Sequence, residues 1–207
     1  MINKKQLFML AGLTLSIVAT PVNALLISVS GPLSSKGVAA SIISAPTSVA
    51  DDGHVNNAMQ GFDEAQDVTT SKNFVIDGGA LLKGKKVNSH MLFLNSGDDS
   101  YISHENVEWI FDGLILGIMS NKSGSKEAAS NSEFGNVGTF YPGSFSARGL
   151  EGNDAYTILG DTLILSMFVS KPGDWIRVIT RVPEPSIMWL LGSGLVFLGF
   201  ARRKVKM

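Results

Sequence analysis

The segment that decides the expected fold is Val107-Glu108-Trp109-Ile110-Phe111-Asp112-Gly113-Leu114-Ile115-Leu116-Gly117-Ile118-Met119. Two short apolar runs, 107–111 and 114–119, flank Asp112-Gly113, and such a two-residue turn between apolar runs predicts a β-hairpin. Similar β-type runs, separated by Gly, Ser, Asn and Asp turns, occur at 25–30, 38–43, 73–76, 87–94, 155–159, 163–169 and 175–180. We therefore expect an all-β protein whose body, residues 25–181, forms a single antiparallel β-sandwich of jelly-roll-like topology.

The body contains little that favours helices. Only residues 57–66 have helical character, and Gly61 weakens it. The stretch 120–136 is rich in Ser, Asn, Lys and Gly, which predicts a long mobile loop. Pro172-Gly173-Asp174 predicts a turn before the closing strand. A parallel α/β fold needs several crossover helices, so this pattern disfavours one.

The N-terminus, residues 1–24, has the pattern of a signal peptide. Lys4-Lys5 is followed by an apolar segment over 7–19 and by Val22-Asn23-Ala24, a small-residue cleavage site. We expect export by the Sec machinery and cleavage by signal peptidase between Ala24 and Leu25. The alternative is an uncleaved anchor helix, which the short apolar run and the proline before the cleavage site disfavour.

The C-terminus carries a second apolar segment, residues 186–201, which contains no charged residue and ends at Arg202-Arg203-Lys204. As a helix it would be roughly 24 Å long, short of the hydrocarbon core of about 30 Å. It is a marginal transmembrane segment whose basic end is expected to stay cytoplasmic. Pro183 and Pro185 hold the chain around Glu184 extended, the form a processing enzyme grips most easily. On these physical grounds alone, a simple membrane anchor remains the alternative.

Three ordered parts of residues 182–207 resemble a PEP-CTERM sorting signal: the Val182-Pro183-Glu184-Pro185-Ser186 motif, the short Leu/Gly-rich span and the basic cluster. The resemblance implies an exported protein of a Gram-negative bacterium, anchored in the membrane until an exosortase processes it, and then located at the cell surface or outside the cell. Exosortases are membrane enzymes associated with exopolysaccharide production. By this resemblance Val182, Pro183, Glu184 and Pro185 form the sorting motif, and Arg202, Arg203 and Lys204 stop transfer. Residues 61–66 and 173–180 are similar to segments of other PEP-CTERM proteins, which implies a common sandwich module.

Composition excludes several classes of function. Without its two terminal segments the chain has 11 Lys and Arg against 17 Asp and Glu, a net charge of -6. An acidic body lacks the clustered cations that neutralise nucleic-acid phosphates, so we expect no nucleic-acid partner. The chain has no cysteine, which excludes disulfides and thiolate metal sites.

No motif in the body indicates a cofactor. Residues 79–86 nearly match a phosphate loop, but Lys86 replaces the Ser or Thr that would hold magnesium. His90 lies in an alternating strand and is expected to be a hydrogen-bonded sheet residue, whereas His54 and His104 are expected to be solvated. Asp51-Asp52 and Asp98-Asp99 are expected to be turn residues, with calcium binding as the alternative.

These observations favour a non-catalytic surface or matrix protein over an enzyme. The alternatives are an exported polysaccharide-acting hydrolase, which needs a cleft where two carboxylates or a histidine and a carboxylate converge, and a carbohydrate-binding module, which needs exposed coplanar aromatic rings. Trp109 and Trp175 lie in apolar strands and are expected in the core, while Phe140, Tyr141 and Phe145 are more loop-like.

Overall fold

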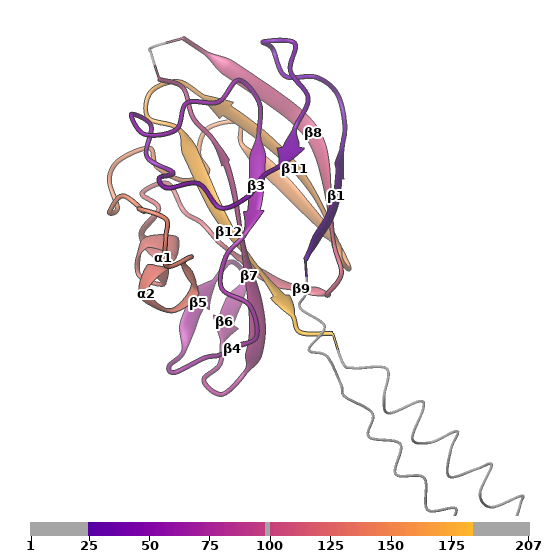
Figure 1. Cartoon of the computed structure of the whole chain (residues 1–207), viewed down its shortest axis with the longest axis vertical. Helices are drawn as coiled ribbons and strands as arrows, with labels where there is room; N and C mark the ends of the chain where they lie inside the picture. Colours follow the sequence, from indigo (N-terminus) through magenta and orange to yellow (C-terminus); the bar gives the residue numbers. More distant parts are fainter. Residues whose placement is uncertain (1–24, 98–99, 184–207) are drawn as a thin grey trace, which may run out of the picture. The chain divides into compact units, whose positions relative to one another are not determined.

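The computed structural model describes residues 25–97 and 100–183 and confirms the all-β class (Figure 1). The signal peptide (1–24), Asp98-Asp99, and the tail from Glu184 onward lie outside the described residues. The predictions for Ala24, Glu184, Pro185, the span 186–201 and the basic cluster therefore remain predictions. Within the described ranges, no helix has the length and hydropathy that crossing a bilayer requires.

Four antiparallel strands form the first sheet, in the order β1 (Leu26–Ser30), β8 (Ile102–Phe111), β11 (Thr162–Val169) and β10 (Ala155–Leu159). Burial alternates residue by residue along β11, the pattern of a strand with one face on the core and one toward solvent. The predicted strands 155–159 and 163–169 are thus confirmed.

A second sheet has the order β2 (Ser41–Ile42), β3 (Gln60–Asp63), β7 (Lys86–Leu94), β12 (Asp174–Arg181) and β9 (Ile115–Met119), with β4 (Val68–Thr69) pairing to the start of β7. Its pairings are antiparallel except that β2 runs parallel to β3. A separate hairpin is formed by β5 (Phe74–Ile76) and β6 (Gly79–Leu81). Residues 79–86, which nearly match a phosphate loop, contain β6, the turn after it and the first residue of β7.

The two sheets share one hydrophobic core. Its buried residues come from both sheets, and one of them, Trp109, is fully buried. The opposite face of the six-stranded sheet is covered by the β5–β6 hairpin and by the segment carrying α1 (Ser125–Ala128) and α2 (Asn131–Phe134). In Figure 1 both helices lie on the side of β12 and β7 away from β1. Because β7 and β12 have apolar contacts on both faces, they are buried along almost their whole length.

The predicted hairpin at Asp112-Gly113 is wrong. The strand before it, β8, pairs with β1 and β11 in the first sheet, whereas the strand after it, β9, pairs with β12 in the second sheet. Both sides of β8 are already occupied by partners, so the chain crosses from one sheet to the other at these two residues.

Two further expectations for local structure are corrected. Residues 57–66 are not helical, because β3 forms there and pairs with β7. A side chain at Gly61 would place a Cβ 2.7 Å from the Trp109 ring, so glycine serves here for close packing in a strand. The stretch 120–136 forms two one-turn helices, not a loop without structure, and its Glu127 and Phe134 are fully buried.

Candidate functional site

The two ends of the described body meet at one short segment, Asp112-Gly113-Leu114, which we call the exit segment. Near the start of the body, the backbone N–H of Asp112 donates to the carbonyl oxygen of Leu25 at 3.2 Å. At the other end, the backbone N–H of Arg181 donates to the carbonyl oxygen of Leu114 at 2.8 Å. The crossover between sheets therefore fixes where both ends of the chain leave the body.

Glycine at position 113 is required by this geometry. A Cβ there would overlap the carbonyl oxygen of Arg181, which is backbone and has no room to move aside. Beside it, Asp112 is half-buried, and burial raises the pKa of its carboxyl group. The Oδ1 atom of Asp112 is buried without a hydrogen-bond partner among the described residues. The exit segment is thus closely packed against the end of β12.

The segment that leaves the body at this point is the beginning of the predicted sorting motif. Strand β12 is buried from Asp174 to Thr180, and Arg181 ends it as an exposed residue. Val182 and Pro183 follow as half-exposed residues outside the strand. Proline fixes its own φ and restricts the residue before it to extended conformations, so this stretch leaves the body as extended chain. At the other end Leu25 is 49% exposed and directly precedes β1.

A β-rich body followed at once by an extended proline-containing segment, a short apolar run and a basic cluster defines a class: proteins that carry a C-terminal sorting signal. Residues 181–204 match the family model of the PEP-CTERM protein-sorting motif. The chain therefore carries a PEP-CTERM protein-sorting motif, and this motif implies an exported protein with a membrane-anchored precursor that an exosortase processes. The match begins at Arg181, the last residue of β12. No curated protein and no solved structure matches the chain.

A histidine and a carboxylate do converge in the body, together with a hydroxyl group. Nδ1 of His90 lies 2.7 Å from Oδ1 of Asp63, and Nε2 of His90 lies 3.0 Å from Oγ1 of Thr180. The order carboxylate, imidazole and hydroxyl matches that of a nucleophilic triad. However, His90 and Thr180 are both fully buried in the second sheet, so the hydroxyl group does not face solvent. This arrangement confirms the prediction that His90 is a hydrogen-bonded sheet residue.

Two carboxylates also converge, at the start of β12. Asp174 is only 3% exposed, and burial together with the neighbouring carboxylates of Asp154 and Glu151 raises the pKa of Asp174 to about 10. Asp154 accepts backbone N–H groups from Phe168 at 2.7 Å and from Glu151 at 2.6 Å. This raised pKa favours the protonated form of the Asp174 carboxyl group at neutral pH. Among the described residues, no group of His, Asp or Glu side chains is arranged to hold a metal ion.

The remaining predicted polar residues divide into confirmed and corrected cases. His104 is not solvated: it is 1% exposed, and it lies 3.0 Å from the N–H of Met59 and 2.9 Å from the carbonyl oxygen of Pro32. His54 is half-buried beside Gln60. Asp51 and Asp52 lie in a turn, as expected; Asp52 is exposed, whereas Asp51 is buried and accepts the N–H of Gly173 at 2.8 Å.

The aromatic residues form no flat exposed platform in the described part of the chain. Trp109 and Trp175 are fully buried, which confirms the prediction for both. The ring of Phe145 packs edge-on against Trp175, with 5.9 Å between centroids, and the Tyr141 ring lies under the Arg177 guanidinium at 5.5 Å. Phe140 is 61% exposed.

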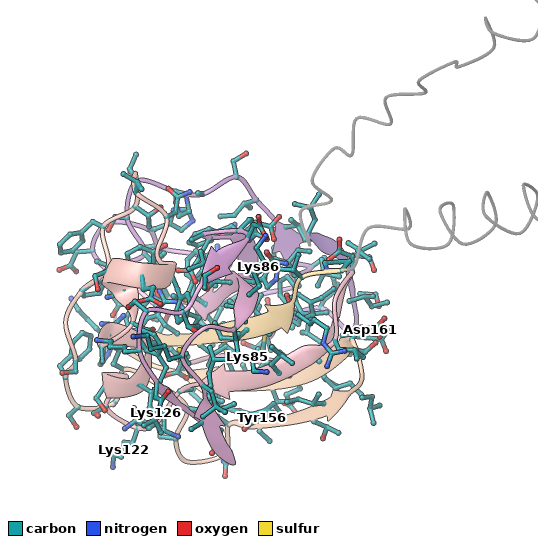
Figure 2. All side chains as sticks on the ribbon, turned by 90° about the horizontal axis from the view of Figure 1, so that it is seen from below. Lys85, Lys86, Lys122, Lys126, Tyr156 and Asp161 are labelled. Atoms are coloured by element: carbon teal, nitrogen blue, oxygen red, sulfur yellow. The ribbon has the colours of Figure 1, made fainter. Side chains whose placement is uncertain are left out.

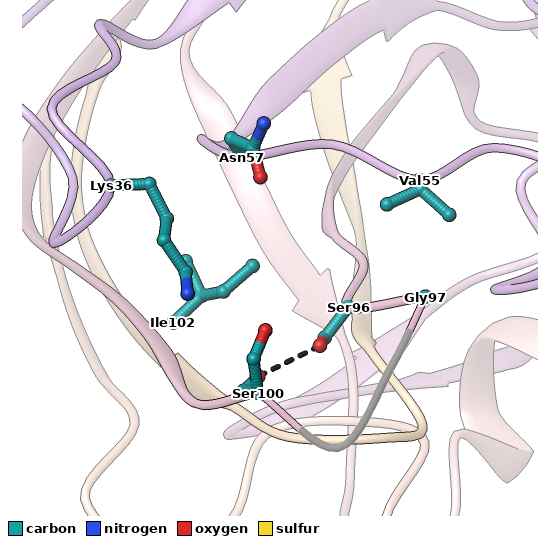
Figure 3. Close-up of a pocket in the computed structure, with 7 residues that line it drawn as sticks. All are labelled: Lys36, Val55, Asn57, Ser96, Gly97, Ser100 and Ile102. Carbon is teal, nitrogen blue, oxygen red and sulfur yellow. Dashed lines mark hydrogen bonds between the residues drawn. The ribbon is translucent and has the colours of Figure 1, made fainter.

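The larger of two described surface cavities lies at the end of the body where β8 begins. Its volume is about 400 Å³, and its lining combines hydroxyl, amide and ammonium groups with two aliphatic side chains (Figure 3). The lining residues are Lys36, Val55, Asn57, Ser96, Gly97, Ser100 and Ile102. In Figure 3 Lys36 extends into the cavity toward Ser100, which is joined to Ser96 by a hydrogen bond. No carboxylate or aromatic ring is among these described lining residues.

Sequence reasoning missed a buried ionic network that holds the helical segment to the second sheet. Arg177 in β12 donates to both carboxylate oxygens of Glu64, at 2.6 and 2.8 Å, and to Ser130 at 2.5 Å. Arg148 pairs with Glu127 at 2.5 Å, and complete burial raises the pKa of Glu127 to about 8 even with this cation beside it. The sequence did contain one signal for this network, because Arg177 is a charged residue within the apolar run 175–180, and a buried arginine needs a partner.

Proposed function

We propose that this protein is a non-catalytic component of the cell surface or extracellular matrix, delivered by exosortase processing in an exopolysaccharide or biofilm context. The observation that carries the proposal is the position of the sorting motif, which begins where β12 ends and whose next residues, Val182 and Pro183, lie half-exposed outside the strand. A processing enzyme can therefore reach the motif without unfolding the sheet. The body itself would be a stable jelly-roll-like β-sandwich that is handed over intact.

The arrangement of polar groups supports a structural role for the body over a catalytic one. Thr180 and His90 are buried within the second sheet, and the carboxylates of Asp174 and Asp154 line neither of the two described cavities. A hydrolase needs a nucleophile or a pair of carboxylates that substrate can touch. The burial of these groups supports the structural role over the hydrolase alternative.

The proposal is tested by intact mass of the protein from its native host, with and without the exosortase gene. We expect loss of residues 1–24 in every background, and loss of the tail only when both the enzyme and Glu184 are present. The variants are Glu184→Ala and, as a matched control, Glu105→Ala, the same change at an exposed residue of β8.

Two results would contradict the proposal. A tail that persists in every background would make the segment an ordinary membrane anchor. A tail that is lost equally in the Glu184→Ala variant would show that another protease acts there. Fractionation of cells that do or do not secrete exopolysaccharide then tests whether the processed body stays with the polymer.

A further inference from the structure

The end of the body where the chain leaves it carries an apolar hollow surrounded by cations. The hollow has a volume of about 300 Å³ and is lined by aliphatic side chains, including Leu82 and Leu116, and by Lys85, Lys86 and Arg181. Figure 2 views the body from below and shows Lys85 and Lys86 toward its middle, with Asp161, whose carbonyl oxygen accepts the N–H of Phe111, nearer the edge. Three cations and no carboxylate line this hollow in the described part of the chain.

These cations are unusual for a body with a net charge of -6. Lys86 pairs with Asp67 at 2.7 Å. Within residues 25–97 and 100–183, the side chains of Lys85 and Arg181 have no ion-pair partner, and both residues are exposed. Two free positive charges therefore lie beside apolar surface, which favours an anionic partner that also has an apolar part.

Exposed leucines extend this surface to the exit segment. Leu82 is 54% exposed, and Leu25 and Leu114 are each 49% exposed. Leu114 accepts the backbone N–H of Arg181, and Leu25 accepts that of Asp112, so both leucines border the place where the chain ends leave. Single exposed leucines are ordinary. Here they are grouped with cations, and we name this set the basal face: Leu25, Leu82, Lys85, Lys86, Leu114 and Arg181.

The length of chain beyond the body indicates what covers the basal face. The apolar run begins at Ser186, five residues after Arg181, so the two residues are at most about 18 Å apart even in fully extended chain. We propose that in the membrane-anchored precursor the basal face docks on a bilayer containing anionic phospholipids. Lys85 and Arg181 bind lipid phosphates, and the leucines enter the boundary between headgroups and acyl chains. This inference rests on the anchored precursor of the proposed function.

The absence of cysteine from the chain makes a direct test possible, because one introduced cysteine is the only labelling site. Ala80 lines the hollow, is exposed and belongs to neither the cations nor the leucines, so Ala80→Cys reports on docking without weakening it. Val55→Cys is the control. Val55 is 57% exposed and lies near Gly97, beyond the opposite end of β7 from Lys86. The nine residues of β7 place these ends about 27 Å apart.

The mature chain, residues 25–207, is labelled with bimane at the introduced cysteine. It is then reconstituted into vesicles that contain spin-labelled phosphatidylcholine as the quencher. The vesicles are either phosphatidylcholine alone or an equimolar mixture with phosphatidylglycerol. We expect strong quenching of the label at position 80 in the anionic vesicles and weak quenching at position 55. Lys85→Gln/Arg181→Gln should lower the ratio of docked to undocked protein roughly 25-fold, because each cation near an anionic surface contributes about fivefold.

Lys36→Gln/Lys171→Gln removes the same charge at the opposite end of the body and should leave the ratio unchanged. Equal quenching at positions 80 and 55 would overturn the docking. So would an equal decrease of the ratio of docked to undocked protein in the Lys85→Gln/Arg181→Gln and Lys36→Gln/Lys171→Gln variants. Vesicle flotation measures separately whether the chain is anchored in the bilayer. A chain that floats with vesicles but whose label at position 80 stays unquenched overturns only the docking, whereas a chain that stays in solution overturns the anchored precursor as well.

Discussion

Replacing Arg177 by methionine is expected to be among the most destabilising changes available in this body. The guanidinium donates five hydrogen bonds: two to Glu64, and one each to Ser130, Asn131 and the carbonyl oxygen of Glu127. After the substitution, the carboxylate of Glu64 remains fully buried without its paired cation and keeps only neutral donors, such as the Ser89 hydroxyl at 2.6 Å. Breaking a buried ion pair in this way costs about 3–5 kcal/mol.

The measurement is urea unfolding of residues 25–183 followed by tryptophan fluorescence. This range contains two tryptophans, Trp109 and Trp175, which are both fully buried, so the signal reports on loss of the core. With an m-value of about 2 kcal/mol/M, the loss moves the midpoint down by roughly 2 M. The control is Lys86→Met, which breaks an ion pair of similar length, 2.7 Å, whose side chains are 59% and 38% exposed. An exposed pair contributes at most about 1 kcal/mol. Equal losses in the two variants would refute the reasoning, because burial would then not decide the cost.

The other predictions concern the carboxylate pair, the exit segment and the buried triad. The pKa of Asp174 is raised in the folded state to about 10, above its value of about 3.9 in the unfolded chain, so only the unfolded state loses the proton between these values. The free energy of unfolding should therefore fall as the pH rises through that window, by at most about 1.4 kcal/mol per pH unit. Asp174→Asn should flatten the profile of unfolding midpoint against pH. A slope that this variant leaves unchanged would contradict the raised pKa of Asp174. Gly113→Ala should lower the melting temperature, because the new methyl group meets the Arg181 carbonyl oxygen, and an unchanged temperature would mean that the exit segment is loosely held. Thr180→Val should leave any polysaccharide turnover by the purified protein unchanged, since the hydroxyl group is buried against His90, and a loss of turnover would favour the hydrolase.

Strand positions could be predicted from the sequence, but strand partners could not. The runs 87–94, 155–159 and 163–169 are each confirmed, because β-type residues between turn residues describe the chain locally. The segment from Val107 to Met119 contains two strands as expected, yet they belong to different sheets. A two-residue Asp-Gly turn permits a hairpin without requiring one, and the choice is made by β1 and β11, which are distant in sequence and occupy both edges of β8.

The candidate site divides in the same way into local features, which the sequence predicts, and contacts between distant residues, which it does not. The sorting motif is a local signal in an ordered series of residues, and it was found from the sequence. The exit segment brings Leu25, Asp112 and Arg181 together from three separate regions, so no local pattern indicates it. The burial of His104 was missed for the same reason: its polar, acidic sequence neighbours suggested solvent, while its actual partners are Met59 and Pro32.

The position of β12 in its sheet determines how the protein responds to a pull on its tail. The strand pairs with β7 from Asp174 to Arg181 and with β9 from Arg177 to Thr180. A force that acts on Arg181 along the axis of β12 loads both ladders in shear, so their hydrogen bonds must fail together instead of being peeled apart singly. The tail is therefore attached to a central strand of the six-stranded sheet. Machinery that extracts or degrades this protein from its C-terminus must break that strand out of the sheet before any other part of the body yields.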